Sequence, residues 1–231
     1  MRTIIFDIKG PYAHFRKPYA PASPVTYPFP PPPTVLGMMG AILGLGKDEY
    51  HEALGWNDIR IGIRLLKPIQ IYRTALNLHN TKKSWCDIKS RLQIPYEFLK
   101  NPAFRIYAAN LPEQQADHLT SCLSTGKTAY TPSLGLAQCL AEISFVADAA
   151  ARPAVDATAT FSVIPLRQST IIEYEPGRRY ERVRVAAKMG PDRTVHEYRE
   201  AVTCLDNNKN QPVMGNGLEL YEVNDEYVAF F

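Results

Sequence analysis

Prolines dominate one segment near the beginning of the chain. Eight of the chain's 19 prolines fall between Pro18 and Pro33. Proline fixes φ and carries no backbone N–H, so such a segment can form neither the interior of a helix nor a central strand. The sequence therefore predicts a stiff, extended surface segment over residues 18–33.

A short helix is expected directly after the prolines. Thr34 is a candidate N-cap, and from Val35 to Leu45 apolar residues recur at helical spacing. This pattern predicts a helix with one apolar stripe, entered from the proline-rich segment.

Three glycines of this helix, Gly37, Gly40 and Gly44, are spaced to share one face. Glycine inside a helix costs about 0.5–1 kcal/mol relative to alanine, so we expect a close approach to this backbone. Two interpretations remain open. The helix packs tightly against a sheet, or its N-terminus, with free N–H groups and the positive end of the helix dipole, binds a phosphate backbone or a partner chain.

Alternation of apolar and polar residues predicts the strands. The first strand covers residues 3–9, and a second, with an apolar and a basic face, covers residues 59–65 and continues toward Tyr72-Arg73. A polar stretch at 77–93 is expected to project as an arm. Further along the chain the patterns indicate a strand at 104–107, a helix at 113–123 ended by Gly126, a turn-rich loop at 130–135 and a strand opening at 140–145.

The last third of the chain is typical of β-hairpins. One is predicted from residues 169–174 and 178–187 around the turn 175–177, and another from 218–223 and 226–231 around Asn224-Asp225.

Composition limits the classes of protein to which the chain can belong. Apolar residues make up 45% and charged residues 21% of 231 positions, which is typical of a folded globular chain with one large domain, or one domain with an elaborated half. The longest apolar stretch, residues 35–45, is too short to span a membrane. We expect a cytoplasmic protein with reduced cysteines and no membrane partner.

Motifs for common catalytic chemistry are absent from the sequence. It contains no phosphate-binding loop, no dinucleotide fingerprint, no nucleophile elbow and no zinc-ligand spacing, and its five histidines are isolated. We therefore expect no cofactor and no metal. A metal-independent ribonuclease needs only a base, an acid and a cation, and His14 with Tyr12 and Lys17, or His79 with its neighbouring lysines, could supply them.

Nucleic-acid binding has better support, because cations and aromatic rings are interleaved in three places. Cations bind phosphates and rings stack on bases. The net charge of only +3 means that the argument depends on where these charges lie. The clusters are Arg16 and Lys17 with Phe15, Tyr19 and Tyr27; Lys82, Lys83, Lys89 and Arg91 with Trp85; and Arg178, Arg179, Arg182, Arg184 and Lys188 with Tyr180. Each cluster could also be an ordinary solvated face.

Several motifs lie within the first 145 residues: FDIKGPYAHFRKP at 6–18, TYPFPPPPT at 26–34 and GMMGAILG at 37–44, and more weakly PYEFLKNP at 95–102 and YTPSLG at 130–135. Through these motifs the chain resembles the fifth CRISPR-associated protein family, most closely its subtype I-B branch. The resemblance implies an α+β fold of the RAMP superfamily. Residues 1–150 would form an RRM-like, ferredoxin-type β-α-β-β-α-β core with a β-hairpin thumb inserted at about 77–100, and residues 151–231 a C-terminal β-rich part packed on it.

The same resemblance implies a non-catalytic scaffold subunit of a type I surveillance complex, Cascade. Its partners would be the 5′ tag of the CRISPR guide RNA, the backbone subunit, the large subunit and, indirectly, target DNA. One family branch cuts repeat RNA with a tyrosine and adjacent lysine and histidine residues; this chain has no Lys-His or His-Lys pair. Metal-independent cleavage of repeat RNA is the alternative function. The RNA-binding residues expected are Arg16, Lys17, Tyr27, Thr34, Gly37, Gly40, Lys82, Lys83, Lys89, Arg91, Tyr130, Arg178, Arg179, Arg182 and Arg184.

Overall fold

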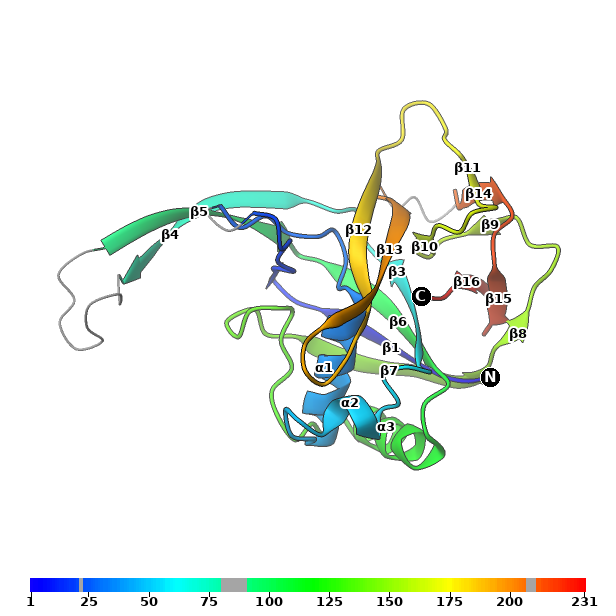
Figure 1. Ribbon diagram of the computed structural model, residues 1–231, viewed down its shortest axis with the longest axis horizontal. Coiled ribbons are helices and arrows are strands. Elements are labelled where there is room, and N and C mark those ends of the chain that lie inside the picture. Colours follow the sequence, from blue (N-terminus) through cyan, green and yellow to red (C-terminus); the bar gives the residue numbers. More distant parts are fainter. Residues whose placement is uncertain (21–22, 80–90, 207–210) are drawn as a thin grey trace.

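The computed structural model describes residues 1–20, 23–79, 91–206 and 211–231, which form a sheet-rich fold with few helices (Figure 1). None of the helices in these ranges is long and apolar enough to cross a membrane.

A four-stranded antiparallel sheet lies at the centre of the molecule. Its strand order is β3-β6-β1-β7. The expected first strand is confirmed: Ile4, Phe6 and Ile8 of β1 face the large core on the helical side, whereas Ile5 belongs to a second core on the other side. The strands are β1 (Arg2–Lys9), β3 (Arg60–Leu65), β6 (Ala103–Ala109) and β7 (Glu142–Ala150).

Helices cover one face of this sheet: α1 (Pro32–Leu43), the short α2 (Tyr50–Ala53) and α3 (Glu113–Thr125). Gly126 ends α3 in the left-handed conformation, as expected, and Gly44 ends α1 in the same way. Thr34 is not the N-cap of α1. Pro31 holds that position, because proline's fixed φ suits a helix start and its missing N–H costs nothing there.

The proline-rich segment is not a surface segment throughout. Thr26, Tyr27 and Phe29 are buried, because Tyr27 and Phe29 carry large apolar rings between the prolines. The buried backbone is satisfied locally: Tyr27 N donates to Phe15 O at 2.8 Å, and Phe15 N donates to the Thr26 hydroxyl at 2.9 Å.

A long β-hairpin extends away from the rest of the molecule (Figure 1). It consists of β4 (Ile71–His79) and β5 (Arg91–Lys100), and β2 (Tyr12–Ala13) pairs with the base of β5. The expected continuation of β3 toward Tyr72 is wrong, since β3 ends at Leu65 and β4 belongs to a different sheet. The arm also begins at residue 71 rather than 77.

The described residues of the C-terminal third form two hairpins, of which one was expected. β15 and β16 pair around Asn224 and Asp225, as predicted, and both of these turn residues have positive φ. The expected hairpin of 169–174 with 178–187 is wrong: β12 pairs with β13, and β11 pairs with β14. The bounds are β8 (Arg152–Pro153), β9 (Ala159–Thr160), β10 (Ile164–Pro165), β11 (Ile171–Glu173), β12 (Tyr180–Met189), β13 (Val195–Cys204), β14 (Val213–Asn216), β15 (Leu220–Val223) and β16 (Glu226–Ala229).

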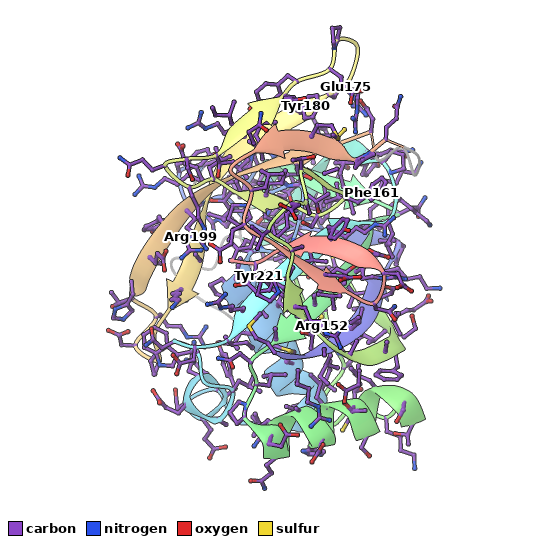
Figure 2. All side chains as sticks on the ribbon, turned by 90° about the vertical axis from the view of Figure 1, so that its right-hand side faces the viewer. Arg152, Phe161, Glu175, Tyr180, Arg199 and Tyr221 are labelled. Carbon is purple, nitrogen blue, oxygen red and sulfur yellow. The ribbon has the colours of Figure 1, made fainter. Side chains whose placement is uncertain are left out.

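The C-terminal strands cover the second face of the central sheet (Figure 2). Val228 and Phe230 pack on Ile5 and Tyr107. The large core also joins the two parts of the chain, because Val183 and Val185 of β12 belong to the same cluster as the residues of α1. Both faces of the central sheet are therefore buried.

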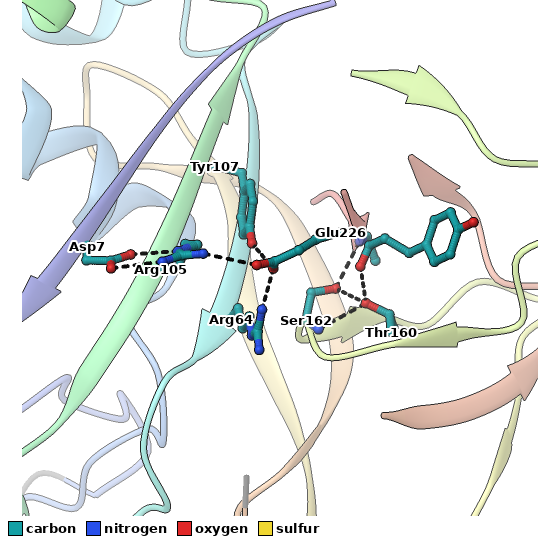
Figure 3. A network of polar contacts seen from close by, with 9 residues as sticks. Asp7, Arg64, Arg105, Tyr107, Thr160, Ser162 and Glu226 are labelled. Atoms are coloured by element: carbon teal, nitrogen blue, oxygen red, sulfur yellow. Dashed lines mark hydrogen bonds and ion pairs between the residues drawn. The ribbon is translucent and has the colours of Figure 1, made fainter. Parts of the chain in front are cut away.

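A polar network crosses this second interface at Glu226 of β16 (Figure 3). Its carboxylate binds Arg64 at 2.5 Å and Arg105 at 3.0 Å, and accepts a hydrogen bond from the Tyr107 hydroxyl at 2.5 Å. Arg105 also binds Asp7 at 2.8 Å. Three strands of the central sheet are thus tied to the C-terminal hairpin.

Candidate nucleic-acid interface

Two basic clusters that are distant in the sequence meet on one surface. Lys17 and Tyr27 both contact β12, and Lys17 Nζ binds Glu181 Oε1 of that strand at 2.9 Å. The Tyr27 hydroxyl donates to the Arg184 carbonyl oxygen at 2.8 Å. We call this region the basic surface and define it as Arg16, Lys17, Tyr19, Arg182, Arg184 and Tyr198.

Arg16 is positioned by a close turn of the chain. It forms a β-bridge with Thr26, and Lys17 N donates to Val25 O at 3.0 Å. The Arg16 side chain is exposed and has no carboxylate partner among the described residues. It is therefore available to an anionic ligand.

Lys17 has a different environment from its neighbour. Only 13% of its side chain is exposed, and its ammonium group lies 5.5 Å from the centre of the Tyr27 ring. Burial lowers the pKa of Lys17, but the hydrogen bond and charge of Glu181 outweigh it, so the pKa is raised. Lys17, unlike the exposed Arg16, does not point into solvent, because Glu181 holds it against the protein.

Arg182 and Arg184 project from the exposed face of β12, as alternation with the buried Val183 and Val185 predicts. Arg182 is paired with Glu200. The Arg184 guanidinium lies 4.7 Å from the centre of the Tyr198 ring and has no carboxylate partner among the described residues. Arg184 and Arg16 are thus the two cations of the basic surface that remain free.

Tyr198 was missed by the sequence analysis. It lies on β13, where exposed His196, Tyr198 and Glu200 alternate with half-buried residues. That period-two pattern could have identified an exposed ring. Its role beside Arg184 depends on the pairing of β12 with β13, which was predicted incorrectly.

Tyr27 does not offer its ring to solvent. It is 4% exposed, and burial raises its pKa to about 12. Tyr27 therefore supports the basic surface from beneath, through Lys17 and the Arg184 carbonyl.

Arg178 and Arg179, which directly precede β12, are held by contacts within the protein. Arg178 is 10% exposed, binds Glu175 at 3.1 Å and donates to the carbonyl oxygens of Gln211 and Pro212. Arg179 binds Asp206 through its Nε at 2.6 Å. Arg178 thereby holds the backbone of Gln211 and Pro212, directly before β14.

The start of α1 does not provide the expected phosphate site. Pro32 and Pro33 have no N–H, and Thr34 N donates to Pro31 O at 2.9 Å. The expected free N–H groups are therefore not there. The glycine face packs on α2: a Cβ on Gly40 would lie 2.8 Å from Tyr50 Cβ, whereas one on Gly37 would be 3.8 Å from the Tyr50 hydroxyl.

The other expected residues lie away from the basic surface. Tyr130 is 60% exposed, and its N–H bonds to Ala41 O near the C-terminal end of α1. Arg91 is exposed at the outer end of β5. Lys82, Lys83 and Lys89 lie outside the described residues.

The histidine considered for ribonuclease chemistry is enclosed. His14 is 2% exposed, its Nδ1 lies 2.7 Å from Glu97 O, and burial lowers its pKa. His79 is exposed at the end of β4, and the lysines considered with it lie outside the described residues. Within the described ranges no group of His, Cys, Asp or Glu could hold a metal ion.

Comparison with known proteins gives a consistent result. A family model described as CRISPR-associated protein (Cas_Cas5) matches residues 3–201. No curated protein matches the chain. A solved CRISPR protein from Archaeoglobus fulgidus is similar over 99% of this chain and 98% of its own, with 15% identity and a TM-score of 0.59. A chain of a CRISPR RNA-guided surveillance complex is similar over 94% of this chain and 92% of its own, with 12% identity and a TM-score of 0.56.

Proposed function

Because the chain belongs to the CRISPR-associated Cas5 family, we propose that it is a non-catalytic, guide-RNA-binding scaffold subunit of a type I surveillance complex. It caps the 5′ tag of the guide RNA and contacts the backbone and large subunits, reaching target DNA only through the complex. The subtype I-B branch fits its N-terminal motifs best.

The observation that carries this proposal is the contact between the N-terminal segment and β12, which brings the segments of Arg16 and Arg184 together. These segments are 168 positions apart and are joined through Lys17–Glu181 and Tyr27–Arg184, and neither Arg16 nor Arg184 has an acidic partner among the described residues. Tyr19, 69% exposed, and Tyr198, 46% exposed, provide rings beside them. Free guanidinium groups next to open rings suit single-stranded RNA, which is bound through its phosphates and its bases.

The fold supports the same assignment. The path β1-α1-β3-β6-α3-β7 with strand order β3-β6-β1-β7 fits the RRM-like, ferredoxin-type core of the family, and the β4–β5 hairpin fits its thumb. A scaffold role without catalysis is favoured by the enclosed His14 and by the pairing of Lys17 with Glu181. The chain also lacks the adjacent lysine and histidine of the cleaving branch.

The test is assembly of the complex in cells that express the guide RNA and the partner subunits. We expect Arg16→Ala with Arg184→Ala to reduce the guide RNA recovered with the tagged chain at least tenfold, while the melting temperature of the purified chain changes little. The matched control is Arg152→Ala with Lys127→Ala, which removes the same charge from exposed positions elsewhere. Arg152 lies on β8, next to the C-terminal strands (Figure 2).

Equal recovery of guide RNA with the two double variants would contradict the assignment of the basic surface. Incubation of the purified chain with repeat RNA in EDTA tests catalysis. Specific cleavage that is lost in the His79→Ala variant would replace the scaffold role by the ribonuclease role.

A further inference from the structure

A hollow of about 290 Å³ lies where the base of the β4–β5 hairpin meets β2. It is separate from the basic surface and shares no residue with it. The lining residues are Tyr12, Tyr72, Thr74, Leu76, Phe98, Gln138 and Cys139.

Strand register places the aromatic rings of the hollow on one face. Tyr72 lies opposite Phe98, and Tyr12 lies opposite Lys100, so all four side chains share a face of the small sheet. The Tyr12 and Tyr72 ring centres are 5.8 Å apart, and those of Tyr12 and Phe98 are 6.1 Å apart. Phe98 is only 7% exposed and forms the floor, whereas Tyr12 and Tyr72 are 39% and 43% exposed and keep ring surface open.

The loop of residues 134–139 closes the hollow on one side and is fixed in place. Gly135 has φ +95°, and a Cβ there would lie 2.0 Å from His14 O, so only glycine allows this approach. His14 N donates to Leu134 O at 3.0 Å. This seating puts Gln138, which is exposed, at the rim.

We propose that the hollow binds one unpaired nucleobase of the guide RNA, which stacks on Tyr72 or Tyr12. The proposal rests on the proposed function. Gln138 offers both an amide donor and an acceptor, and Thr74 a hydroxyl, to the edge of the base. The exposed Lys100, beside Tyr12 on the same face, is available to the adjoining phosphate.

The chemistry of the hollow favours a base over an apolar side chain of a partner protein. Its lining combines two exposed tyrosine rings with Leu76, Phe98 and Cys139, and it carries the Gln138 amide and the Thr74 hydroxyl, with Lys100 on the same sheet face next to Tyr12. Stacking on an aromatic ring accepts any base, and the polar rim can select among them.

The hollow is also within reach of the basic surface. Tyr12 and Arg16 are four residues apart, which is about 13 Å in an extended chain. The His14 ring lies between them, 5.7 Å from the ring of Phe98. One strand of RNA could therefore contact Arg16 through a phosphate and place a nearby base in the hollow.

The experiment measures binding of fluorescein-labelled octauridylate and octaadenylate to the full chain by fluorescence anisotropy. We expect Tyr72→Ala to weaken binding about tenfold or more, as loss of one base–aromatic stack does, and Tyr72→Phe to restore it. Tyr227→Ala is the matched control, since Tyr227 is 47% exposed on β16, outside both surfaces. Gln138→Ala should change the ratio of the two affinities.

A walk of single abasic sites through the RNA supplies the decisive comparison. At one position, removing the base should weaken binding to the parent chain but not to the Tyr72→Ala variant. Such a result would show that this base and the Tyr72 ring interact, because the loss of one makes the other irrelevant to binding. If the parent binds RNA and Tyr72→Ala binds it equally well at every position, the nucleobase site is wrong and the proposed function stands. Equal RNA binding with loss of copurifying subunits would make the hollow a protein-docking surface. If the parent binds neither RNA at low salt, with or without partner subunits, both proposals fail.

Discussion

Glu226 shows how one side chain can hold two parts of the chain together. It is 23% exposed and lies among Arg64, Arg105 and Tyr107, each on the central sheet. Burial raises the pKa of Glu226, but the hydrogen bonds from Tyr107 and Arg64 and the two arginine charges outweigh it, so the pKa lies below the ordinary value of 4.5. The charged form is thus the one that stabilises the fold.

We expect Glu226→Gln to lower the free energy of unfolding by about 2 kcal/mol at pH 7. This loss is less than the roughly 3–5 kcal/mol for breaking a fully buried ion pair, because Arg105 retains its ion pair with Asp7. Because the pKa of Glu226 is lowered in the folded state, its charged form stabilises the fold fully at pH values above its ordinary pKa. That stabilisation is lost as the pH falls through the folded-state pKa. Urea unfolding of parent and variant should therefore differ at pH 7, and the difference should shrink as the pH falls below 4.5. Glu222→Gln, on the exposed side of β15, is the control; a loss as large in that variant would contradict the role of Glu226.

Lys17 illustrates why a site residue cannot be chosen from sequence alone. Arg16 and Lys17 are adjacent cations, and the sequence treats them alike. Tertiary pairing with Glu181, 164 positions away, separates them. The chemistry of the candidate surface was predictable, but the availability of each cation was not.

At the scale of elements, the glycine face of α1 is explained by α2. A Cβ on Gly40 would lie 2.8 and 3.0 Å from Tyr50 Cβ and Cγ, atoms that cannot move without α2, whereas Gly37 has room. Both open interpretations of the glycine face assumed a different neighbour, because a helix of only four residues, Tyr50–Ala53, gives a weak sequence signal.

This packing predicts opposite effects of two equivalent changes. We expect Gly40→Ala to lower the melting temperature, because α1 and α2 must separate. Gly37→Ala should leave the melting temperature unchanged or raise it, because alanine favours the helix over glycine by up to about 1 kcal/mol. Thermal unfolding followed by circular dichroism measures both. Equal melting temperatures for the two variants would show that α2 adapts without cost.

Elements were predictable where their determinants are local. The alternation in β1, the glycine that ends α3 and the Asn224-Asp225 turn between β15 and β16 each act within a few residues. β11 and β12 were paired wrongly because the choice of partner strand depends on contacts across the sheet. The Glu175-Pro176-Gly177 turn alone suggested a hairpin, yet β11 pairs with β14 more than 40 positions later.

At the scale of the whole molecule, burial of both faces of the central sheet decides where RNA can bind. An RRM domain stacks bases on the open face of its sheet. Here that face carries Tyr107, which is 1% exposed beneath the C-terminal strands. The proposed function therefore predicts RNA contacts at the margin of the molecule, for which the basic surface and the hairpin base are the candidates.

The distribution of charge over the molecule also limits how strongly it can hold RNA alone. The net charge is +3, and many arginines are tied to carboxylates. Each phosphate contact to a single strand contributes about 0.7 to the slope of log K against log salt. Arg16 and Arg184, with or without Lys100, then give two or three contacts and a slope of about −1.4 to −2.

We therefore expect weak, only mildly salt-dependent binding of a tagged guide RNA to the chain alone, and stable binding once the partner subunits are present. Arg16→Ala should make the slope shallower by about 0.7, because it removes one free cation. Lys17→Ala should leave the slope unchanged, since Lys17 is neutralised by Glu181.

Anisotropy titrations between 50 and about 300 mM salt, a range in which phosphate contacts are screened progressively, measure all three slopes. A parent slope steeper than about −4, or equal effects of the two substitutions, would mean that other cations bind the phosphates and that the basic surface is not the main RNA contact.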